Sequence, residues 1–239
     1  MTLFWTRTCD AVASALFPTG CVSCGELIAA ADPPLCPECW ERLPLIDGPS
    51  CRCGSPLSGS GGEQCGRCRR SRSPLLEGTA LGIYEGPLRD CVVALKYRGR
   101  HRTAERLAFR LGRLVRCRAI LRASEVVIGV PLHPDRAKER GFNQADLLAS
   151  ALAKGAGLKV SCGLIRARNT PSQTDLSARA RRRNVLSAFA VVPNAGLRGA
   201  AVVLVDDVTT TGATLRECAS TLLAAGVREV RSITVARAE

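Results

Sequence analysis

The sequence predicts an α/β fold, in which helices pack on a parallel sheet, with a cysteine-rich module on its amino-terminal side. After residue 73, apolar runs with the character of strands alternate with stretches of helical periodicity. Such alternation is typical of a parallel sheet covered on both faces. Eight cysteines fall between Cys21 and Cys68, which sets this segment apart from the rest. We therefore expect a module over residues 1–72 and an α/β domain over residues 73–239.

The individual elements follow from local patterns, taken in chain order. Residues 1–17 predict an amphipathic helix that ends before Pro18, and the basic stretch 69–74 predicts a linker. The expected strands span residues 80–86, 125–132, 160–167, 189–192, 200–207 and 229–237. The expected helices span residues 87–121, with a break near Gly99, residues 142–157, closed by Gly155 or Gly157, and residues 212–226. In parallel sheets of this kind, ligands bind beyond the carboxyl ends of the strands.

Charge is unevenly distributed along the chain. The formal net charge is +13 over 239 residues, yet residues 1–75 hold seven basic and seven acidic side chains. The whole excess therefore belongs to residues 76–239, which favours polyanionic or phosphorylated partners. A basic surface that serves solubility is the alternative. Aromatic residues make up only 4% of the chain, which argues against extensive stacking on nucleic-acid bases.

The sequence also favours a cytoplasmic protein that is not inserted in a membrane. No apolar run approaches the roughly 20 residues that a bilayer span needs. The short apolar stretch near the start is interrupted by Asp10, which fits an amphipathic helix better than a signal peptide. In the cytoplasm, paired cysteines are more often metal ligands than disulfides.

The eight clustered cysteines have the spacing of zinc ligands. They form four pairs separated by eleven residues each: Cys21 and Cys24, Cys36 and Cys39, Cys51 and Cys53, and Cys65 and Cys68. A short Cys-x-x-Cys turn places two sulfurs on one Zn²⁺ ion, and two such turns complete a tetrahedral site. Cys51 is the doubtful ligand, because only one residue separates it from Cys53. We expect one or two Zn²⁺ ions.

We expect this zinc to be structural rather than catalytic. A catalytic zinc keeps an open position and usually employs histidine, but His101 and His133 lie far outside the cluster. Structural zinc supplies folding energy to a segment that is too poor in apolar residues to form a core alone. Four further cysteines lie in apolar contexts and are expected to be small buried residues: Cys91, Cys117, Cys162 and Cys218.

The segment "VVLVDDVTTTGATL", residues 202–215, combines a buried strand with two carboxylates and a threonine-rich loop. Asp206 and Asp207 are adjacent, so their side chains point to opposite sides of the strand, and both need partners there. The loop that follows offers hydroxyls, backbone N–H groups and the start of a helix, which together suit a phosphate. Ribose 5-phosphate has this layout, and no Walker sequence occurs. A solvated acidic turn is the alternative.

The same segment resembles the 5-phosphoribosyl 1-pyrophosphate (PRPP) signature of type I phosphoribosyltransferases. The stretches "GVPLHPDRAKERGFNQADLLA" and "LIRARNTPSQTDLSARARRRNV", together with the cysteine module, resemble the ComF/GntX-like competence proteins. The resemblance extends from Cys21 to Arg237. It implies a type I phosphoribosyltransferase-like parallel sheet preceded by a double zinc ribbon. It also implies that PRPP is bound together with Mg²⁺.

The resemblance further implies roles for particular residues. Asp206 and Asp207 would contact the ribose hydroxyls and, with Arg140, would form the catalytic set. The 5-phosphate would be cradled by Thr209, Thr210, Thr211, Gly212 and Thr214. The pyrophosphate side would be formed by Pro131, Leu132 and His133, with Arg136, Arg140 and Gln144 beside them. A packing role for His133, and a plain helix start at residues 140–144, are the alternatives.

Two basic features complete this interpretation. The stretch 166–183 would be a mobile loop that closes over PRPP, or else a solvated basic face. Lys96 lies in a family-like segment without an assigned role. Three functions stay open: a transferase acting on a nitrogenous acceptor, a PRPP-binding protein of DNA uptake, and a PRPP sensor. The partners would be PRPP and either single-stranded DNA or a competence or helicase protein.

Overall fold

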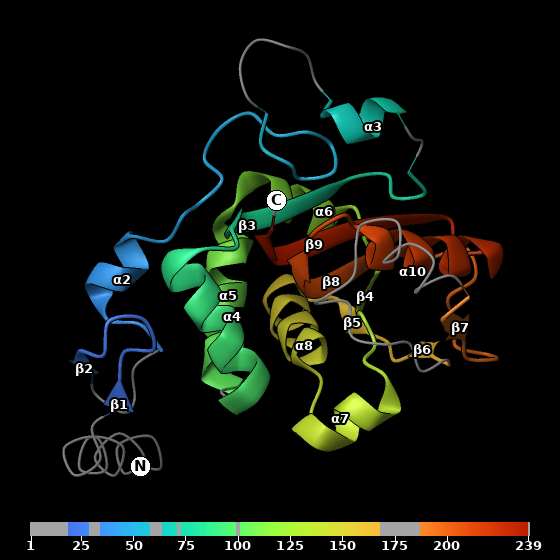
Figure 1. Cartoon of the computed structure of the whole chain (residues 1–239). Helices are drawn as coiled ribbons and strands as arrows, with labels where there is room; N and C mark the ends of the chain where they lie inside the picture. Colours follow the sequence, from blue (N-terminus) through green and yellow to red (C-terminus); the bar gives the residue numbers. More distant parts are fainter. Residues whose placement is uncertain are drawn as a thin grey trace.

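The structure of the chain, a computed structural model, describes residues 19–28, 34–57, 64–70, 73–98, 101–167 and 187–238 (Figure 1). The helix predicted over residues 1–17 lies outside the described residues, as does most of the basic stretch 166–183. The α/β prediction is confirmed by the five-stranded sheet at the centre of the molecule.

All pairings in this sheet are parallel, in the order β3-β9-β8-β4-β5. The strands are β3 (Gly78–Ile83), β4 (Val126–Gly129), β5 (Lys159–Val160), β8 (Ala201–Thr209) and β9 (Glu229–Arg237). The central strand β8 is buried almost throughout, as its run of valines and leucine predicts. Because the strands are parallel, their carboxyl ends all meet at one edge of the sheet, where the acidic pair of β8 lies.

The prediction of a single strand over residues 160–167 is wrong. The chain leaves the sheet after β5, turns at Cys162 and Gly163, and then forms β6 (Leu164–Arg166). β6 pairs antiparallel with β7 (Phe189–Val191) in a separate two-stranded sheet. Gly163 fits the turn because a Cβ there would lie 2.6 Å from the Ala195 Cβ. This close approach joins segments distant in sequence, so periodicity alone does not reveal it.

The expected helix over residues 87–121 is three helices, α4 (Gly86–Arg98), α5 (His101–Arg113) and α6 (Val115–Arg122). The break near Gly99 was predicted, whereas the second break arises because Leu114 has an extended backbone. α8 (Gln144–Ala156) begins at an Asn143 cap and ends at Gly157, which has a φ of 68°. The short helix α7 (Pro134–Arg140) was not predicted, and α10 (Ala213–Ala224) follows the threonine loop as expected.

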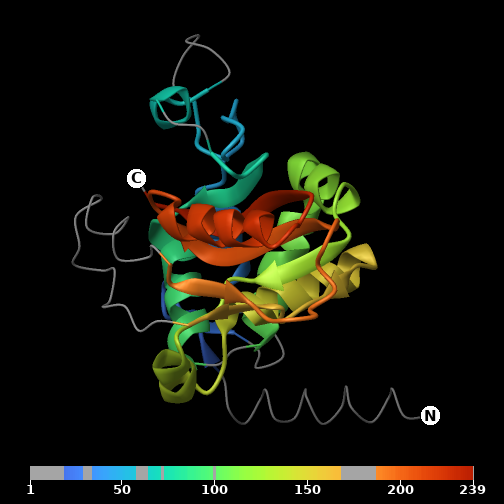
Figure 2. The ribbon, with the colours of Figure 1, turned by 90° about the vertical axis from the view of Figure 1, so that its right-hand side faces the viewer.

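Helices cover both faces of the sheet, and each face has its own hydrophobic core. Val203 and Val205 of β8 pack in one core with residues of α4, α5 and α8. Val202 and Leu204 pack in the other core with residues of α10 and β6–β7. Figure 2 looks onto the α10 side of this arrangement. The same alternation carries on to the strand end, so Asp207 faces α4 and α8 while Asp206 faces the α10 side.

The cysteine module packs against the sheet domain in two places. Its first part contains β1 (Thr19–Gly20), β2 (Leu27–Ile28) and α2 (Pro37–Glu41), and it shares a hydrophobic core with α4 and α5. Its second part contains α3 (Gly66–Arg70) and lies over β3, where the Gly78 amide donates to the Arg52 carbonyl at 2.6 Å. Figure 1 shows α2 and α3 on different sides of the molecule.

Within the described ranges, no helix is both long enough and apolar enough to cross a bilayer.

Candidate phosphate and metal sites

Asp207 is a nearly buried carboxylate, 5% exposed, and three donors surround it. The Lys96 Nζ of α4 lies 3.0 Å from its Oδ2, and the Gln144 Nε2 of α8 donates to the same oxygen at 3.2 Å. The Val208 amide donates to Oδ1 at 2.7 Å. Arg140 in turn donates to Gln144 Oε1 at 3.1 Å. This chain of contacts joins residues that the sequence connected only through the family resemblance.

Lys96 is the member of this network whose role the sequence left unassigned. Burial by itself would lower the pKa of Lys96, but the charge of Asp207 and their hydrogen bond outweigh burial and raise that pKa. The cation therefore stays charged beside the carboxylate. The sequence does contain a signal, since Lys96 directly follows Leu95 in a helix whose neighbours Cys91, Val92 and Leu95 are all buried. A charged residue beside such a helix face needs a charged partner.

Asp206 lies on the opposite side of the strand in a different electrostatic setting. Its Oδ1 accepts a hydrogen bond from the Asp207 amide at 2.9 Å. Burial, and next the charge of Asp207, raise the pKa of Asp206 well above its ordinary value. Burial and then the charge of Arg136 lower the pKa of Arg166 in β6, and Asp206 acts on Arg166 in the opposite direction. Arg166 therefore lies close enough to Asp206 and to Arg136 for both charges to act on it.

The threonine loop links the end of β8 to the start of α10. Gly212 caps the helix with a φ of 71°, a conformation that favours glycine. The Thr211 Oγ1 accepts from the Ala213 amide at 3.3 Å, and the Arg216 Nη2 donates to the Thr211 carbonyl at 2.8 Å. The Arg67 Nη1 of the cysteine module donates to the Thr210 carbonyl at 3.0 Å. The loop thus runs directly into the N-terminus of α10, as the sequence predicted, and its role toward a phosphate stays a prediction.

The loop after β4 lies at the same edge of the sheet. Pro131 and Leu132 are half-buried there, and His133 is buried. The His133 Nδ1 accepts from the Asp135 amide at 3.2 Å, which makes His133 the N-cap of α7. The Asn143 Nδ2 donates to the Val130 carbonyl at 3.1 Å and ties the start of α8 to this loop. His133 therefore caps α7, and its role beside the pyrophosphate stays a prediction.

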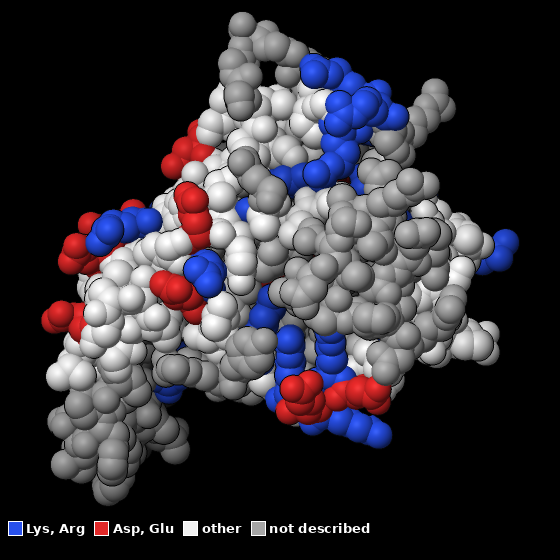
Figure 3. Space-filling model, viewed as in Figure 1, with Lys and Arg blue, Asp and Glu red and all other residues white. Residues whose placement is uncertain are grey.

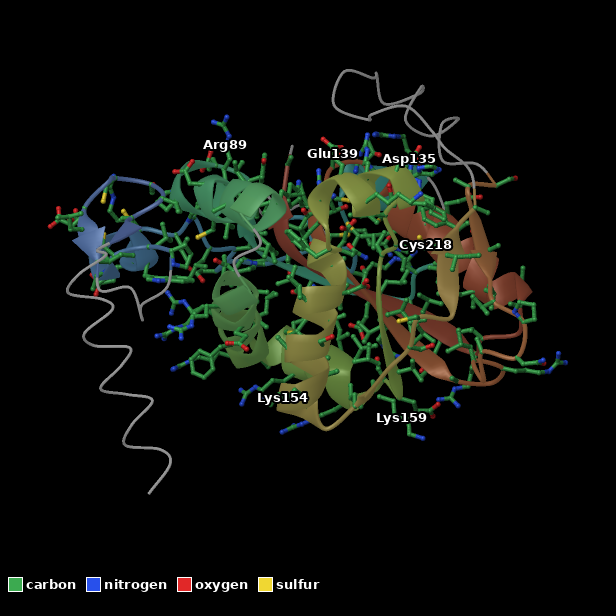
Figure 4. The ribbon with its side chains drawn as sticks, turned by 90° about the horizontal axis from the view of Figure 1, so that it is seen from below. Arg89, Asp135, Glu139, Lys154, Lys159 and Cys218 are labelled. Carbon is green, nitrogen blue, oxygen red and sulfur yellow. The ribbon has the colours of Figure 1, made fainter. Side chains whose placement is uncertain are left out.

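The two ends of the sheet domain differ, as Figure 4 shows. Asp135 and Glu139 of α7 lie at the same end as Arg89 of α4, whereas Lys154 and Lys159 lie at the opposite end. The carboxylates of β8, the threonine loop and the β4 loop share the α7 end, because all of them follow the carboxyl ends of parallel strands. Of the residues assigned by resemblance, those in the described ranges are thus brought to one edge.

The eight clustered cysteines form two sets of four thiols. One set is Cys21, Cys24, Cys36 and Cys39, and the other is Cys51, Cys53, Cys65 and Cys68, with the sulfurs of each set within 4.8 Å of one another. The Cys24 and Cys36 sulfurs are 3.6 Å apart, and those of Cys53 and Cys65 are 3.7 Å apart. Zn–S bonds of about 2.3 Å in a tetrahedron require sulfurs about 3.8 Å apart. Both sets therefore fit Zn²⁺, and Cys51 belongs to the second.

The other cysteines only partly match the expectation that they are small buried residues. Cys91, Cys117 and Cys218 are buried, but Cys162 is exposed, so the expectation is wrong there. The reason is that Cys162 lies in the turn between β5 and β6 rather than inside a strand.

Comparisons with known proteins now identify the family. The double zinc ribbon domain matches residues 12–69, and the phosphoribosyl transferase domain matches residues 138–239. The chain is 37% identical to the DNA utilization protein YhgH of Salmonella typhi, over 75% of this chain and 80% of that protein. It is 34% identical to competence protein F of Haemophilus influenzae, over 78% of this chain and 83% of that protein. The chain belongs to the ComF family of competence proteins.

A third relative of this ComF-family chain aligns with a smaller part of it. The chain is 36% identical to competence protein ComFC of Bacillus subtilis, over 47% of this chain and 44% of that protein. The family assignment confirms the predicted combination of a double zinc ribbon with a phosphoribosyltransferase-like sheet. The roles of individual residues toward PRPP stay predictions.

Metal analysis of the purified chain should give two zinc ions. Cys36→Ser and Cys65→Ser should each remove one equivalent, because each substitution breaks one set of four thiols. Cys162→Ser is the matched control, since Cys162 is exposed and outside both sets, and it should keep both ions. A wild-type chain with a single zinc, measured by plasma mass spectrometry, would contradict the two-site assignment.

Removing the cation beside Asp207 should destabilise the protein. Lys96→Ala leaves a buried carboxylate with its charge uncompensated, so the free energy of unfolding should fall by about 3 kcal/mol. Lys154→Ala removes an exposed lysine and should change the free energy of unfolding by less than about 0.5 kcal/mol. Urea denaturation of the three proteins measures the difference. If both variants unfold at the same urea concentration, Lys96 does not compensate the Asp207 charge.

Proposed function

We propose that this ComF-family chain binds PRPP at the carboxyl edge of β8. The observation that carries the proposal is the juxtaposition of two carboxylates with a loop that runs directly into the N-terminus of α10. In this proposal Asp206 and Asp207 bind the ribose hydroxyls, and the loop of Thr209–Thr214 binds the 5-phosphate. Carboxylates suit hydroxyl donors and backbone N–H groups suit a phosphate, so one short segment serves both halves of ribose 5-phosphate.

The pyrophosphate of PRPP is assigned to the loop after β4 and to the arginines near it. Arg136 and Arg140 are both half-buried on α7, the helix that this loop enters. Mg²⁺, if bound with PRPP, would supply positive charge that offsets the charge of the pyrophosphate. Oxygen ligands of the kind that Mg²⁺ prefers are present at this edge in Asp206 and Asp207. The stretch 166–183, as a loop closing over PRPP, stays a proposal on residues largely outside the described ones.

We propose that the chain is cytoplasmic and that bound PRPP serves DNA utilization or competence, the processes that the relatives' names give for those proteins. The proposed units are residues 1–72, the zinc ribbon, and residues 73–239, the PRPP-binding domain. A transferase and a sensor would use the same site differently. Release of pyrophosphate when a nitrogenous base is added supports a transferase, whereas PRPP binding without release supports a sensor or a partner of a competence or helicase protein.

Calorimetry with PRPP and Mg²⁺ tests the assignment of the carboxylates. The double variant Asp206→Ala/Asp207→Ala should lose at least about 100-fold in affinity, because both contacts to the ribose hydroxyls are removed. Its zinc content should stay at that of the wild type. Glu105→Ala, which removes an exposed carboxylate on α5, should bind as the wild type does. Unchanged affinity in the double variant would refute the hydroxyl contacts, and no binding by the wild type would refute the proposed function.

Single-stranded DNA is the second candidate ligand, favoured by the charge of residues 76–239. On the face shown in Figure 3, basic side chains gather over α3, whereas around α7 they lie beside acidic ones. Binding of a labelled 30-nucleotide strand, followed by fluorescence anisotropy, should weaken with salt, with a log–log slope steeper than about −2. A strand with an uncharged backbone is the control and should not bind. Binding that is independent of salt would contradict this candidate.

A further inference from the structure

Arg67 connects the second cysteine set to the threonine loop, although the two lie far apart in the sequence. It sits on α3 between Cys65 and Cys68, and its Nη1 donates to the Thr210 carbonyl at 3.0 Å across 143 residues. α3 has only five residues. A helix of this length is not stable by itself, so the position of Arg67 depends on how the flanking thiols are held.

The contact has a consequence for the loop backbone. A trans peptide is planar, and its carbonyl and the following N–H point in opposite directions. Arg67 holds the carbonyl of Thr210, and Arg216 holds that of Thr211 at 2.8 Å. Arg67 and Arg216 both border the same small cavity. The Thr211 N–H is therefore expected to point away from Arg67 and the Gly212 N–H away from Arg216, which leaves both groups to face an anion.

The second cysteine set is also fixed firmly against the sheet domain. The Arg237 Nη1 at the end of β9 donates to the Cys53 carbonyl at 3.4 Å. Gly54 has a φ of 80°, and a Cβ there would lie 3.0 Å from the Thr79 Cα in β3. The cavity between this set and the loop is only about 30 Å³ and is bordered by Cys53, Cys68, Thr209, Thr211 and Leu215, among others. The ribbon and the loop are thus in direct packing contact.

The first cysteine set has different neighbours. Cys21, Cys36 and Cys39 pack in a core with residues of α4 and α5. The Arg110 Nη2 of α5 donates to the Trp40 carbonyl at 3.2 Å. The hydrogen bond that joins the module to the threonine loop is donated by Arg67, which lies between two cysteines of the second set. A connection between zinc and the loop is therefore specific to one of the two sites.

We propose that the second zinc site preorganises the phosphate loop through Arg67, so that zinc retention there and PRPP binding strengthen each other. This inference rests on the proposed function, because it assigns a regulator to the same loop. Zinc holds Cys65 and Cys68, these hold Arg67, and Arg67 sets the orientation of the Thr210–Thr211 peptide. Coupling between two ligands is reciprocal by thermodynamic linkage, so PRPP tightens zinc binding at this site by the same factor by which zinc improves PRPP binding.

Calorimetry of PRPP and Mg²⁺ with position 67 variants tests the first half. Arg67→Ala should weaken PRPP binding about tenfold, within the usual range for coupled sites, while both zinc ions are retained. Arg67→Lys should recover part of the loss, because a lysine keeps the charge but not the planar fork. Arg70→Ala on the same helix removes an exposed arginine and should bind as the wild type does.

Zinc release to a chromogenic chelator tests the reciprocal half. At equilibrium, PRPP should reduce the chelator's uptake of one of the two zinc equivalents from the wild type and of neither from Arg67→Ala. Cys65→Ser should weaken PRPP binding, whereas Cys36→Ser should not, because the first set makes no contact of this kind within the described residues. If Arg67→Ala binds PRPP as tightly as the wild type does, or if PRPP protects neither zinc ion, this inference fails while the proposed function stands. A wild type that binds no PRPP would overturn the proposed function and this inference together.

Discussion

The buried carboxylate of Asp207 is the constraint on which the arrangement of the site depends. A carboxylate that is 5% exposed needs several donors at once, and it obtains them from Lys96 on α4, Gln144 on α8 and the amide of Val208. Two helices and the central strand are thereby fixed to one another at the carboxyl edge. The helices on that face of the sheet must therefore pack where their polar side chains can reach Asp207.

Adjacency of the two aspartates extends this constraint to the other face of the sheet. Asp206 points toward α10 and β6, where Arg166 and Arg136 act on the same electrostatic environment. Burial and then the charge of Asp207 raise the pKa of Asp206. One strand end therefore presents, on one side, a carboxylate held by a lysine, a glutamine and a backbone amide and, on the other, a carboxyl group that accepts from the Asp207 amide. The second is the group that a hydroxyl donor or a cation stabilises most.

Local patterns were sufficient for the parts of the site that are contiguous in sequence. The strand, the acidic pair, the loop and α10 follow one another within residues 201–224, so periodicity and turn chemistry predicted them together. The cysteine sets were predicted because ligand spacing is also local. Lys96 and Arg67 were not assigned, because their partners lie more than a hundred residues away. Cys51 needed the fold to bring it to its set, and the domain boundary near residue 72 stays a prediction.

The charge of the zinc ribbon decides how Arg67 acts on the loop. Four thiolates around one Zn²⁺ carry a formal charge of about −2, which offsets the nearby arginines of α3. The ribbon therefore adds little net positive potential at the loop, and attraction of phosphate over a distance is not its contribution. What remains is the direction of the hydrogen bond from Arg67 to the Thr210 carbonyl, which is insensitive to that compensation. In the coupling proposed above, the contribution of the ribbon is thus geometric, since Arg67 would fix the peptide orientation before an anion arrives.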